Sequence, residues 1–153
     1  MRLLLPALLL MASPAVARDS LGQFGGWGAF RDGAHCYAIA EPNGKRTGAS
    51  VAVSSSSSKG VVIQFHAHLR KAAAADRPVR LQVGDWSQAL AAQGQDAWAT
   101  SARADLRILA AIRSGDSLAV SAVDARGRRF TDHYVLAGAA SAIDAAMIGC
   151  IAP

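Results

Sequence analysis

Histidine side chains offer the most evident chemistry in this sequence. His66 and His68 are two residues apart in an alternating segment, so on a β-strand both rings would project from the same polar face. Two imidazoles placed in this way can begin a zinc or copper site, which needs at least a third ligand. No Asp, Glu or Cys lies within a few residues of the pair, and His35 and His133 could join it only through the fold. We therefore predict two ordinary exposed histidines and assign no metal and no cofactor.

Serine and acidic residues lack the sequence surroundings that are typical of catalysis. No serine lies in a Gly-x-Ser-x-Gly elbow, and the Ser-x-x-Lys spacing of Ser56 and Lys59 falls in a run of serines without a helix start. Glu41 is the only glutamate. Asp132 and His133 are neighbours on an expected strand, so they would point to opposite faces. We predict no catalytic residue and a non-enzymatic protein; the alternative is a small secreted hydrolase or metal-dependent enzyme that uses the surface histidines.

Aromatic side chains suggest binding instead. Trp27, Trp86 and Trp98 are expected to be core or rim residues, but exposed indoles suit contact with a carbohydrate or a protein. We take Trp86 and Trp98 as a possible binding surface.

The first 17 residues have the three parts of a cleavable export signal. Arg2 supplies the positive charge, residues 3–11 form an apolar stretch, and Ala15 and Ala17 provide the small residues before a cleavage point at Arg18. The alternative is a membrane anchor, but the apolar run is about half of the roughly 20 residues that cross a bilayer. We expect a periplasmic or secreted protein with no transmembrane segment in its mature chain.

The remaining residues, 18–153, are long enough for one hydrophobic core and too short for two comfortable domains. The whole chain has 16 Lys and Arg against 11 Asp and Glu, a formal net charge of +5. Such an excess could favour anionic lipid or polysaccharide, yet the basic residues are scattered as on an ordinary solvated surface. No nucleic-acid motif accompanies the charge. We expect the partner to be an envelope protein or a cell-surface polymer, and not nucleic acid.

The two cysteines predict one disulfide. In an oxidising compartment Cys36 and Cys150 have no other intramolecular partner. The alternative is a pair of free thiols, one of them reactive, but neither cysteine lies in a Cys-x-x-Cys arrangement typical of redox chemistry.

Alternating apolar residues predict the strands that must position these side chains, and two helices follow late in the chain. Ser101 can cap the first helix, Gly115 stops it, and the second is rich in alanine. We expect strands at 26–30, 35–41, 50–54, 61–70, 79–83, 86–91, 118–122 and 130–136, and helices at 102–113 and 138–148. The predicted fold is mainly β, a β-sandwich-like antiparallel sheet domain with two short helices toward the C-terminus.

Several short motifs carry a resemblance to a known family. They are Gly25-Gly26-Trp27-Gly28, Cys36-Tyr37-Ala38-Ile39, the expected helix at 106–113, the strand at 117–123 and the closing segment from Tyr134 to Ala142. With these features the chain resembles the invasion-associated locus B family of exported proteobacterial proteins. The resemblance implies a mainly β periplasmic or envelope-associated domain with no known catalytic residues. Family members often carry more cysteines, so their disulfide pattern extends at most to Cys36 and Cys150.

Overall fold

The computed structural model describes residues 18–44, 46–56 and 62–151 of the protein. The expected export signal, residues 1–17, lies outside the described residues, as does Lys59 of the Ser-x-x-Lys spacing. The strands are β1 (Asp19–Phe24), β2 (Trp27–Asp32), β3 (His35–Ala40), β4 (Ser50–Ser56), β5 (Val62–His68), β6 (Val79–Val83), β7 (Trp86–Gln93), β8 (Asp96–Trp98), β9 (Ser117–Val123) and β10 (Arg129–Val135), and the helices are α1 (Ala102–Ser114) and α2 (Ala139–Ile151).

All ten strands belong to one sheet, in the order β1-β2-β3-β4-β5-β8-β7-β6-β9-β10. Every neighbouring pair is antiparallel. This arrangement confirms the predicted class, a mainly β protein with an antiparallel sheet and two helices toward the C-terminus. The sheet has two strands that the sequence did not predict, β1 and β8.

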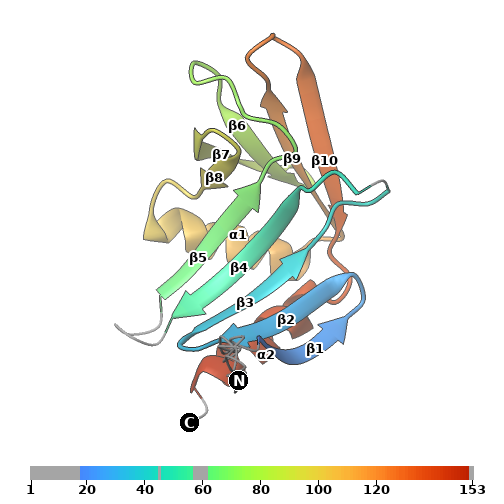
Figure 1. The fold of residues 1–153 in the computed structure, drawn as a ribbon, viewed down its shortest axis with the longest axis vertical. Helices are drawn as coiled ribbons and strands as arrows, with labels where there is room; N and C mark the ends of the chain where they lie inside the picture. The colour runs from blue at the N-terminus through green and yellow to red at the C-terminus, as the bar shows by residue number, and fades with distance from the viewer. Residues whose placement is uncertain (1–17, 45, 57–61, 152–153) are drawn as a thin grey trace, which may run out of the picture.

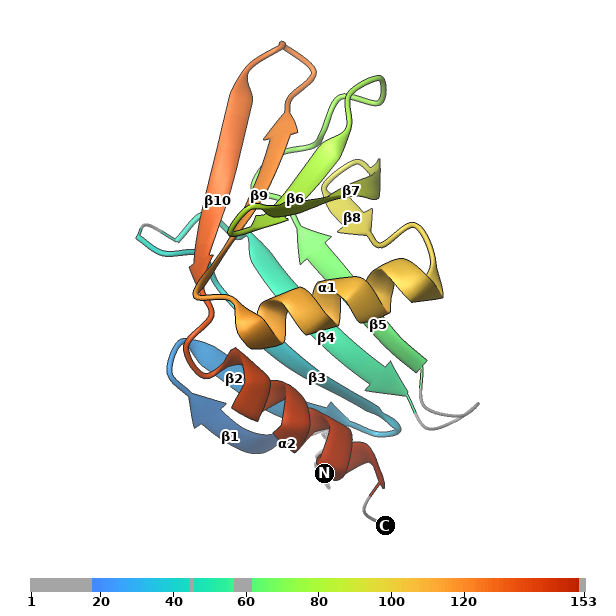
Figure 2. The ribbon, with the colours of Figure 1, turned by 180° about the vertical axis from the view of Figure 1, so that it is seen from behind.

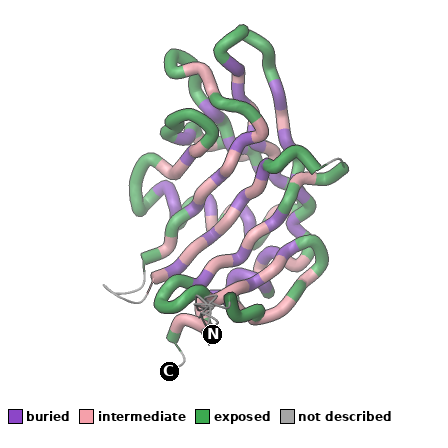
Figure 3. Tube along the Cα trace, viewed as in Figure 1, coloured by how far each residue is buried: buried purple, intermediate pink, exposed green. Residues whose placement is uncertain are grey.

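Both helices pack on the same side of the sheet, which we call the inner face (Figures 1 and 2). Helix α2 contacts β1 to β4, and α1 contacts β5 and β7. Buried residues alternate with half-buried ones along β3, β4 and the second half of β5 (Figure 3), as expected for strands with one covered face. The inner face includes Cys36, Val53 and Phe65, so the core lies between the sheet and the helices. Neither of the two described helices lies on the opposite side of these strands, which we call the outer face (Figures 1 and 2).

The two halves of the sheet are joined by β7. Its first five residues pair with β6 and its last three with β8. The sheet then curves until its ends approach each other. Trp27 on β2 donates its indole N–H to the carbonyl oxygen of Val135 at the end of β10, at 2.9 Å. Gly138 follows with a φ of 88°, and a Cβ there would collide with the carbonyl oxygen of Phe24, so this close approach requires glycine.

Helix α1 begins at the predicted residue, Ala102, and ends one residue later than predicted, at Ser114. Ser101 Oγ accepts a hydrogen bond from the Ala104 N–H at 3.2 Å, which satisfies one of the free donors of the first turn. Ile108 and Ile112 are buried against the sheet. Gly115 ends the helix and donates its N–H to the carbonyl oxygen of Ala111.

Asp105 in the first turn of α1 fastens the helix to the sheet. Its Oδ1 accepts a hydrogen bond from the backbone N–H of Phe65 at 2.7 Å, on β5 just before the residues that pair with β8. The carboxylate is buried, and burial raises the pKa of Asp105, although the hydrogen bond from Phe65 acts in the opposite direction. Loss of this acceptor would leave a buried donor without a partner.

We expect Asp105→Ala to lower the free energy of unfolding by about 1 to 3 kcal/mol, the cost of an unsatisfied buried donor. Asp105→Asn keeps an acceptor oxygen and is expected to cost less at pH 7. Folding raises the pKa of Asp105 above its ordinary value of 3.8, so the ionised carboxylate destabilises the folded state at higher pH. This destabilisation disappears as the pH falls through the pKa of the folded state and the carboxyl group takes up its proton. The stability of the parent relative to Asp105→Asn should therefore rise on acidification. Urea denaturation at several pH values measures both effects, with the exposed Asp76→Ala as control; equal losses for Asp105→Ala and Asp76→Ala would contradict the assignment.

Helix α2 is held on the sheet by small residues and by a disulfide. Ala139, Ala142 and Ala146 are buried, which lets the helix approach the strands closely. The predicted disulfide between Cys36 and Cys150 is present, with the two Cα atoms 5.7 Å apart. It joins β3 to the last turn of α2. Within the described part of the chain, neither helix has the length and apolar character needed to cross a membrane.

Candidate functional site

The outer face of β5 and β8 brings together the polar side chains of greatest chemical interest. His66 and His68 project from β5, and the register places His66 opposite Trp98 and His68 opposite Asp96 on β8. The three-residue β8 follows a turn at Gly94, whose φ of 61° allows the chain to reverse after β7. Four side chains from two adjacent strands therefore meet on an uncovered surface.

Asp96 is the centre of this cluster. His66 Nε2 and His68 Nδ1 each lie 2.9 Å from the same carboxylate oxygen, Asp96 Oδ1. An ionised carboxylate only accepts hydrogen bonds, so both of these nitrogens carry a proton. The hydrogen bond from His68 holds the pKa of Asp96 below its usual value, and the contacts with His66 act in the same direction. The interaction therefore favours the folded state above pH 3.8 and is lost as the pH falls below that value.

Trp98 adds an aromatic surface to the cluster. Its ring centroid lies 5.6 Å from that of His66, with the two planes tilted by 38°. The other neighbour across the sheet is Ala91 on β7, which has a small side chain. Trp98 is half-buried, so it is fixed by its neighbours and still presents part of its ring to solvent. A fixed, partly exposed indole suits contact with a carbohydrate or a protein.

Trp86, the other residue of the predicted binding surface, lies elsewhere. On β7 it shares a face with Leu90, which is buried, and it packs against the core. It lines a pocket of about 370 Å³ with Ser114 at the end of α1 and Gly115 directly after it. Trp86 and Trp98 therefore point to opposite sides of the sheet, and the structure does not bring them together in one surface.

The remaining histidines stay apart from the cluster. His35 begins β3, opposite Asp32 and Ser56, and His133 lies exposed on β10. In the described ranges no group of three or more His, Cys, Asp or Glu side chains is arranged to hold a metal ion.

The cluster also has part of the geometry of a hydrolase. Ser50 on β4 is opposite His68, and His68 in turn is opposite Asp96, so a serine, a histidine and an aspartate occupy neighbouring positions on three strands. Asp96 fixes His68 through Nδ1, which leaves Nε2 as the free base. No hydrogen bond joins Ser50 to His68 within the described residues, and three pockets of the described surface are lined by other side chains.

Asp132 and His133 are separated as the strand alternation predicted. His133 is exposed, whereas Asp132 is 5% exposed on the inner side, 3.3 Å from Arg70 Nε. Burial raises the pKa of Asp132, and the charge of Arg70 acts against this shift. The Arg70–Asp132 ion pair has a structural role. Arg70 also donates to the carbonyl oxygen of Thr131 at 2.7 Å, so it joins the segment after β5 to β10.

Asp96 is the functional candidate that sequence reasoning missed. It lies 28 residues from His68 in the sequence, in a strand of three residues that is too short to show alternation. A signal was present in the glycine turn at Gly94, which brings the chain back beside β7 and next to β5.

Comparison with known proteins supports the fold. No family model matches the sequence, and no curated protein sequence matches it. Among solved structures, the crystal structure of invasion associated protein B from Bartonella henselae matches with a TM-score of 0.61 and 17% sequence identity, over 85% of this chain and 94% of that chain. At this identity the likeness concerns the fold alone. The chain therefore has a fold similar to that of invasion associated protein B, as the resemblance of its short motifs implied.

Proposed function

We propose that this protein is an exported, non-enzymatic protein of the cell envelope, periplasmic or secreted, that binds an envelope protein or a cell-surface polymer through the outer face around Trp98. The observation that carries the proposal is the cluster of Trp98, His66, His68 and Asp96 on the sheet face opposite to the two described helices. Hydrogen bonds to Asp96 hold the imidazole rings of His66 and His68 in one orientation before a partner binds. This lowers the entropic cost of binding.

Export is supported by three independent features. Residues 1–17 have the composition of a cleavable signal, and residues 18–153 would then form the mature domain. The Cys36–Cys150 disulfide fits an oxidising compartment, because cytosolic proteins seldom keep such bonds. The fold is similar to that of invasion associated protein B. The same likeness and the short motifs support membership of the invasion-associated locus B family as part of this proposal; a role in host-cell entry is not part of it.

The binding function is tested by affinity capture of the mature protein from envelope extract, with partners identified by mass spectrometry. We expect Trp98→Ala to reduce the capture of a specific partner by about tenfold or more, because central aromatic residues dominate the free energy of most interfaces. The variant keeps the sheet, since Trp98 is not part of the fully buried core.

Leu106→Ala is the matched control. Leu106 is 56% exposed on α1, so this change also removes an exposed apolar side chain but on the other layer of the molecule. It should leave capture unchanged. Equal capture by the parent and Trp98→Ala would remove Trp98 from the binding surface, and the absence of any partner that the parent enriches over the bare affinity matrix would count against the proposed function.

A further inference from the structure

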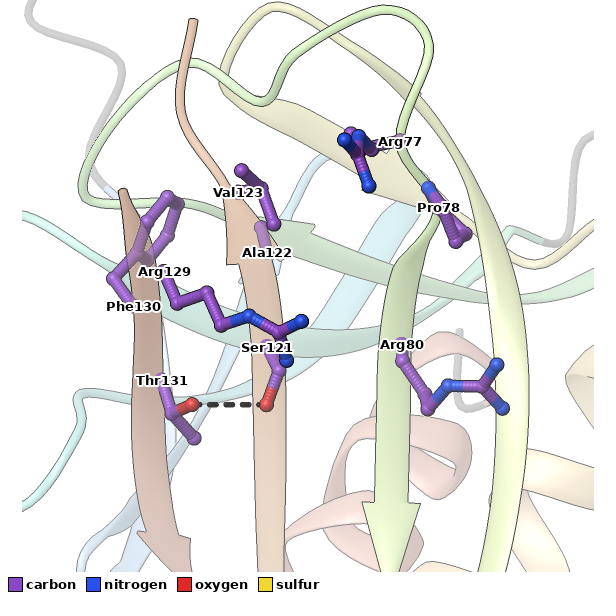
Figure 4. A pocket seen from close by; sticks show the side chains of 9 residues that line it. All are labelled: Arg77, Pro78, Arg80, Ser121, Ala122, Val123, Arg129, Phe130 and Thr131. Atoms are coloured by element: carbon purple, nitrogen blue, oxygen red, sulfur yellow. Dashed lines mark hydrogen bonds between the residues drawn. The ribbon is translucent and has the colours of Figure 1, made fainter. Parts of the chain in front are cut away.

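Three arginines surround a hollow on the solvent-facing side of β6, β9 and β10. The pocket has a volume of about 460 Å³. Arg80 lies on β6, Arg129 on β10, and Arg77 in the segment that leads into β6 (Figure 4). All three side chains are exposed.

The strand alternation separates the charges of this region. On β10, Arg129 and Thr131 lie on the outer side. Asp132 lies on the inner side, where it is buried beside Arg70. Asp124, directly after β9, is also buried and accepts hydrogen bonds from the backbone N–H and the side chain of Arg128. Asp124 and Asp132 are thus buried, whereas Arg129 on the outer side is exposed.

The arginines of the pocket are weakly neutralised. Within the described ranges, no acidic side chain forms an ion pair with Arg80 or Arg129. Arg80 Nη1 donates only to Ser87 Oγ at 3.3 Å. Arg77 has Asp76 at 3.9 Å, but both side chains are largely exposed, and such pairs contribute little. The guanidinium groups therefore remain available to an anion from solvent.

The middle strand supplies a polar floor to the pocket. Ser121 on β9 is opposite both Arg80 and Thr131, and its hydroxyl lies 2.9 Å from the Thr131 hydroxyl. Figure 4 shows the Arg129 side chain extending over β9 toward Ser121, whereas the Arg80 side chain extends the other way, toward Ser87 on β7, and lines the opposite edge of the pocket. Hydroxyl groups at this depth can exchange hydrogen bonds with sugar hydroxyls.

We propose that this pocket binds the phosphate groups of a phosphorylated polysaccharide of the envelope. The inference rests on the proposed function, because it names a ligand class for a binding protein outside the cytoplasm. Guanidinium groups match phosphate oxygens with two parallel hydrogen bonds, and arginines spread over three neighbouring segments fit phosphates repeated along a chain. The one aromatic side chain that lines the pocket, Phe130, is 8% exposed and lies beneath Arg70, so it offers no platform on which a nucleic-acid base could stack.

Phosphorylated dextran is the probe, and its binding to the full mature protein is measured by calorimetry at low salt. We expect the triple variant Arg77→Ala, Arg80→Ala, Arg129→Ala to lose about tenfold or more in affinity, since each guanidinium contributes charge-assisted hydrogen bonds. We also expect the parent's affinity to fall as sodium chloride is raised, because exposed charges are screened. The three arginines are outside the core, and thermal unfolding checks that the variant is folded.

A matched triple variant controls for net charge. Arg46→Ala, Arg103→Ala, Arg107→Ala removes three exposed arginines from other parts of the surface and should bind phosphorylated dextran as the parent does. Unmodified dextran should not bind. Equal losses in both triple variants would mean that net charge alone attracts the polymer, and this result would overturn the proposed site.

Two further probes distinguish other sources of the same phosphate chemistry. Inorganic phosphate should bind at least tenfold more weakly than the polymer, and vesicles of phosphatidylglycerol should not compete with it at equal phosphate concentration. Vesicle binding that exceeds dextran binding would replace the polysaccharide with a membrane surface and overturn the proposal. If phosphorylated dextran does not bind and capture of a partner still depends on Trp98, this inference is refuted and the proposed function stands. If the parent captures no partner but still binds phosphorylated dextran, the proposed binding through the face around Trp98 is refuted and the arginine-lined pocket stands.

Discussion

Replacement of both cysteines, Cys36→Ala with Cys150→Ala, is expected to lower the free energy of unfolding by about 4 to 5 kcal/mol. The disulfide closes a loop with a sequence separation of 114 residues, so it removes many conformations from the unfolded chain. It also attaches the last turn of α2 to β3, where Cys36 is fully buried. Urea denaturation of the oxidised parent and the double variant measures the difference, with a common slope as the check that both unfold in two states.

Reduction of the parent protein provides the control for this prediction. The reduced parent should unfold at nearly the same urea concentration as the double variant, and reductant should not change the variant. Material taken from the envelope fraction should leave Cys36 and Cys150 unreactive toward a maleimide until reductant is added. A double variant within 1 kcal/mol of the oxidised parent would show that the bond contributes little, and two reactive thiols without reductant would remove the bond from the argument for export.

The sequence was sufficient to predict a strand or helix where burial of one side produces a periodic pattern of apolar residues. In β5, Phe65 and Ala67 are buried and His66 and His68 lie on the other face, as the alternation predicted, although the two histidines are half-buried beside Asp96 and not the ordinary exposed residues that we expected. Helix α1 was predicted to within one residue, because Ser101 and Gly115 mark its ends and the isoleucines mark its covered side. These features depend on local chemistry, so the order of the residues alone reveals them.

The strands that the sequence did not predict are the ones without a local pattern. β8 has three residues, and β1 contains Gly22 and an irregular register between Ser20 and Gly22. Both are strands only because a neighbour supplies their hydrogen bonds. Asp96 lies on β8, so the centre of the candidate site depends on strand pairing between residues distant in the sequence, which a single sequence does not reveal.

The register of β7 relates the two proposed binding sites. On its outer side Ala89 is opposite Arg80, and Ala91 is opposite Trp98. Two small side chains therefore separate the arginine-lined pocket from the Trp98 cluster along one strand. A polymer bound to the arginines could extend across these two alanines of β7 and reach Trp98. Trp98→Ala and the triple arginine variant should therefore be compared with the same captured partner.

Trp27→Ala is expected to cost about 3 to 5 kcal/mol of unfolding free energy, the usual range for loss of a large buried aromatic side chain. Trp27 is completely buried, and its side chain has the largest volume among the fully buried residues. Its position gives the change a second effect. The indole N–H donates to the carbonyl oxygen of Val135 at 2.9 Å, so the same side chain fills the core and joins β2 to the end of β10.

Trp27→Phe separates these two contributions. Phenylalanine retains most of the apolar volume but has no donor, so the loss should be close to that of one partly buried hydrogen bond, about 0.5 to 1.5 kcal/mol. Chemical denaturation measures both variants, and hydrogen exchange at the end of β10 should increase in both, because the contact that holds this end of the sheet is absent. Exchange that rises in Trp27→Ala but not in Trp27→Phe would mean that packing, and not the hydrogen bond to Val135, keeps the two ends of the sheet together. A loss below 1 kcal/mol in Trp27→Ala would contradict the position of Trp27 in the core.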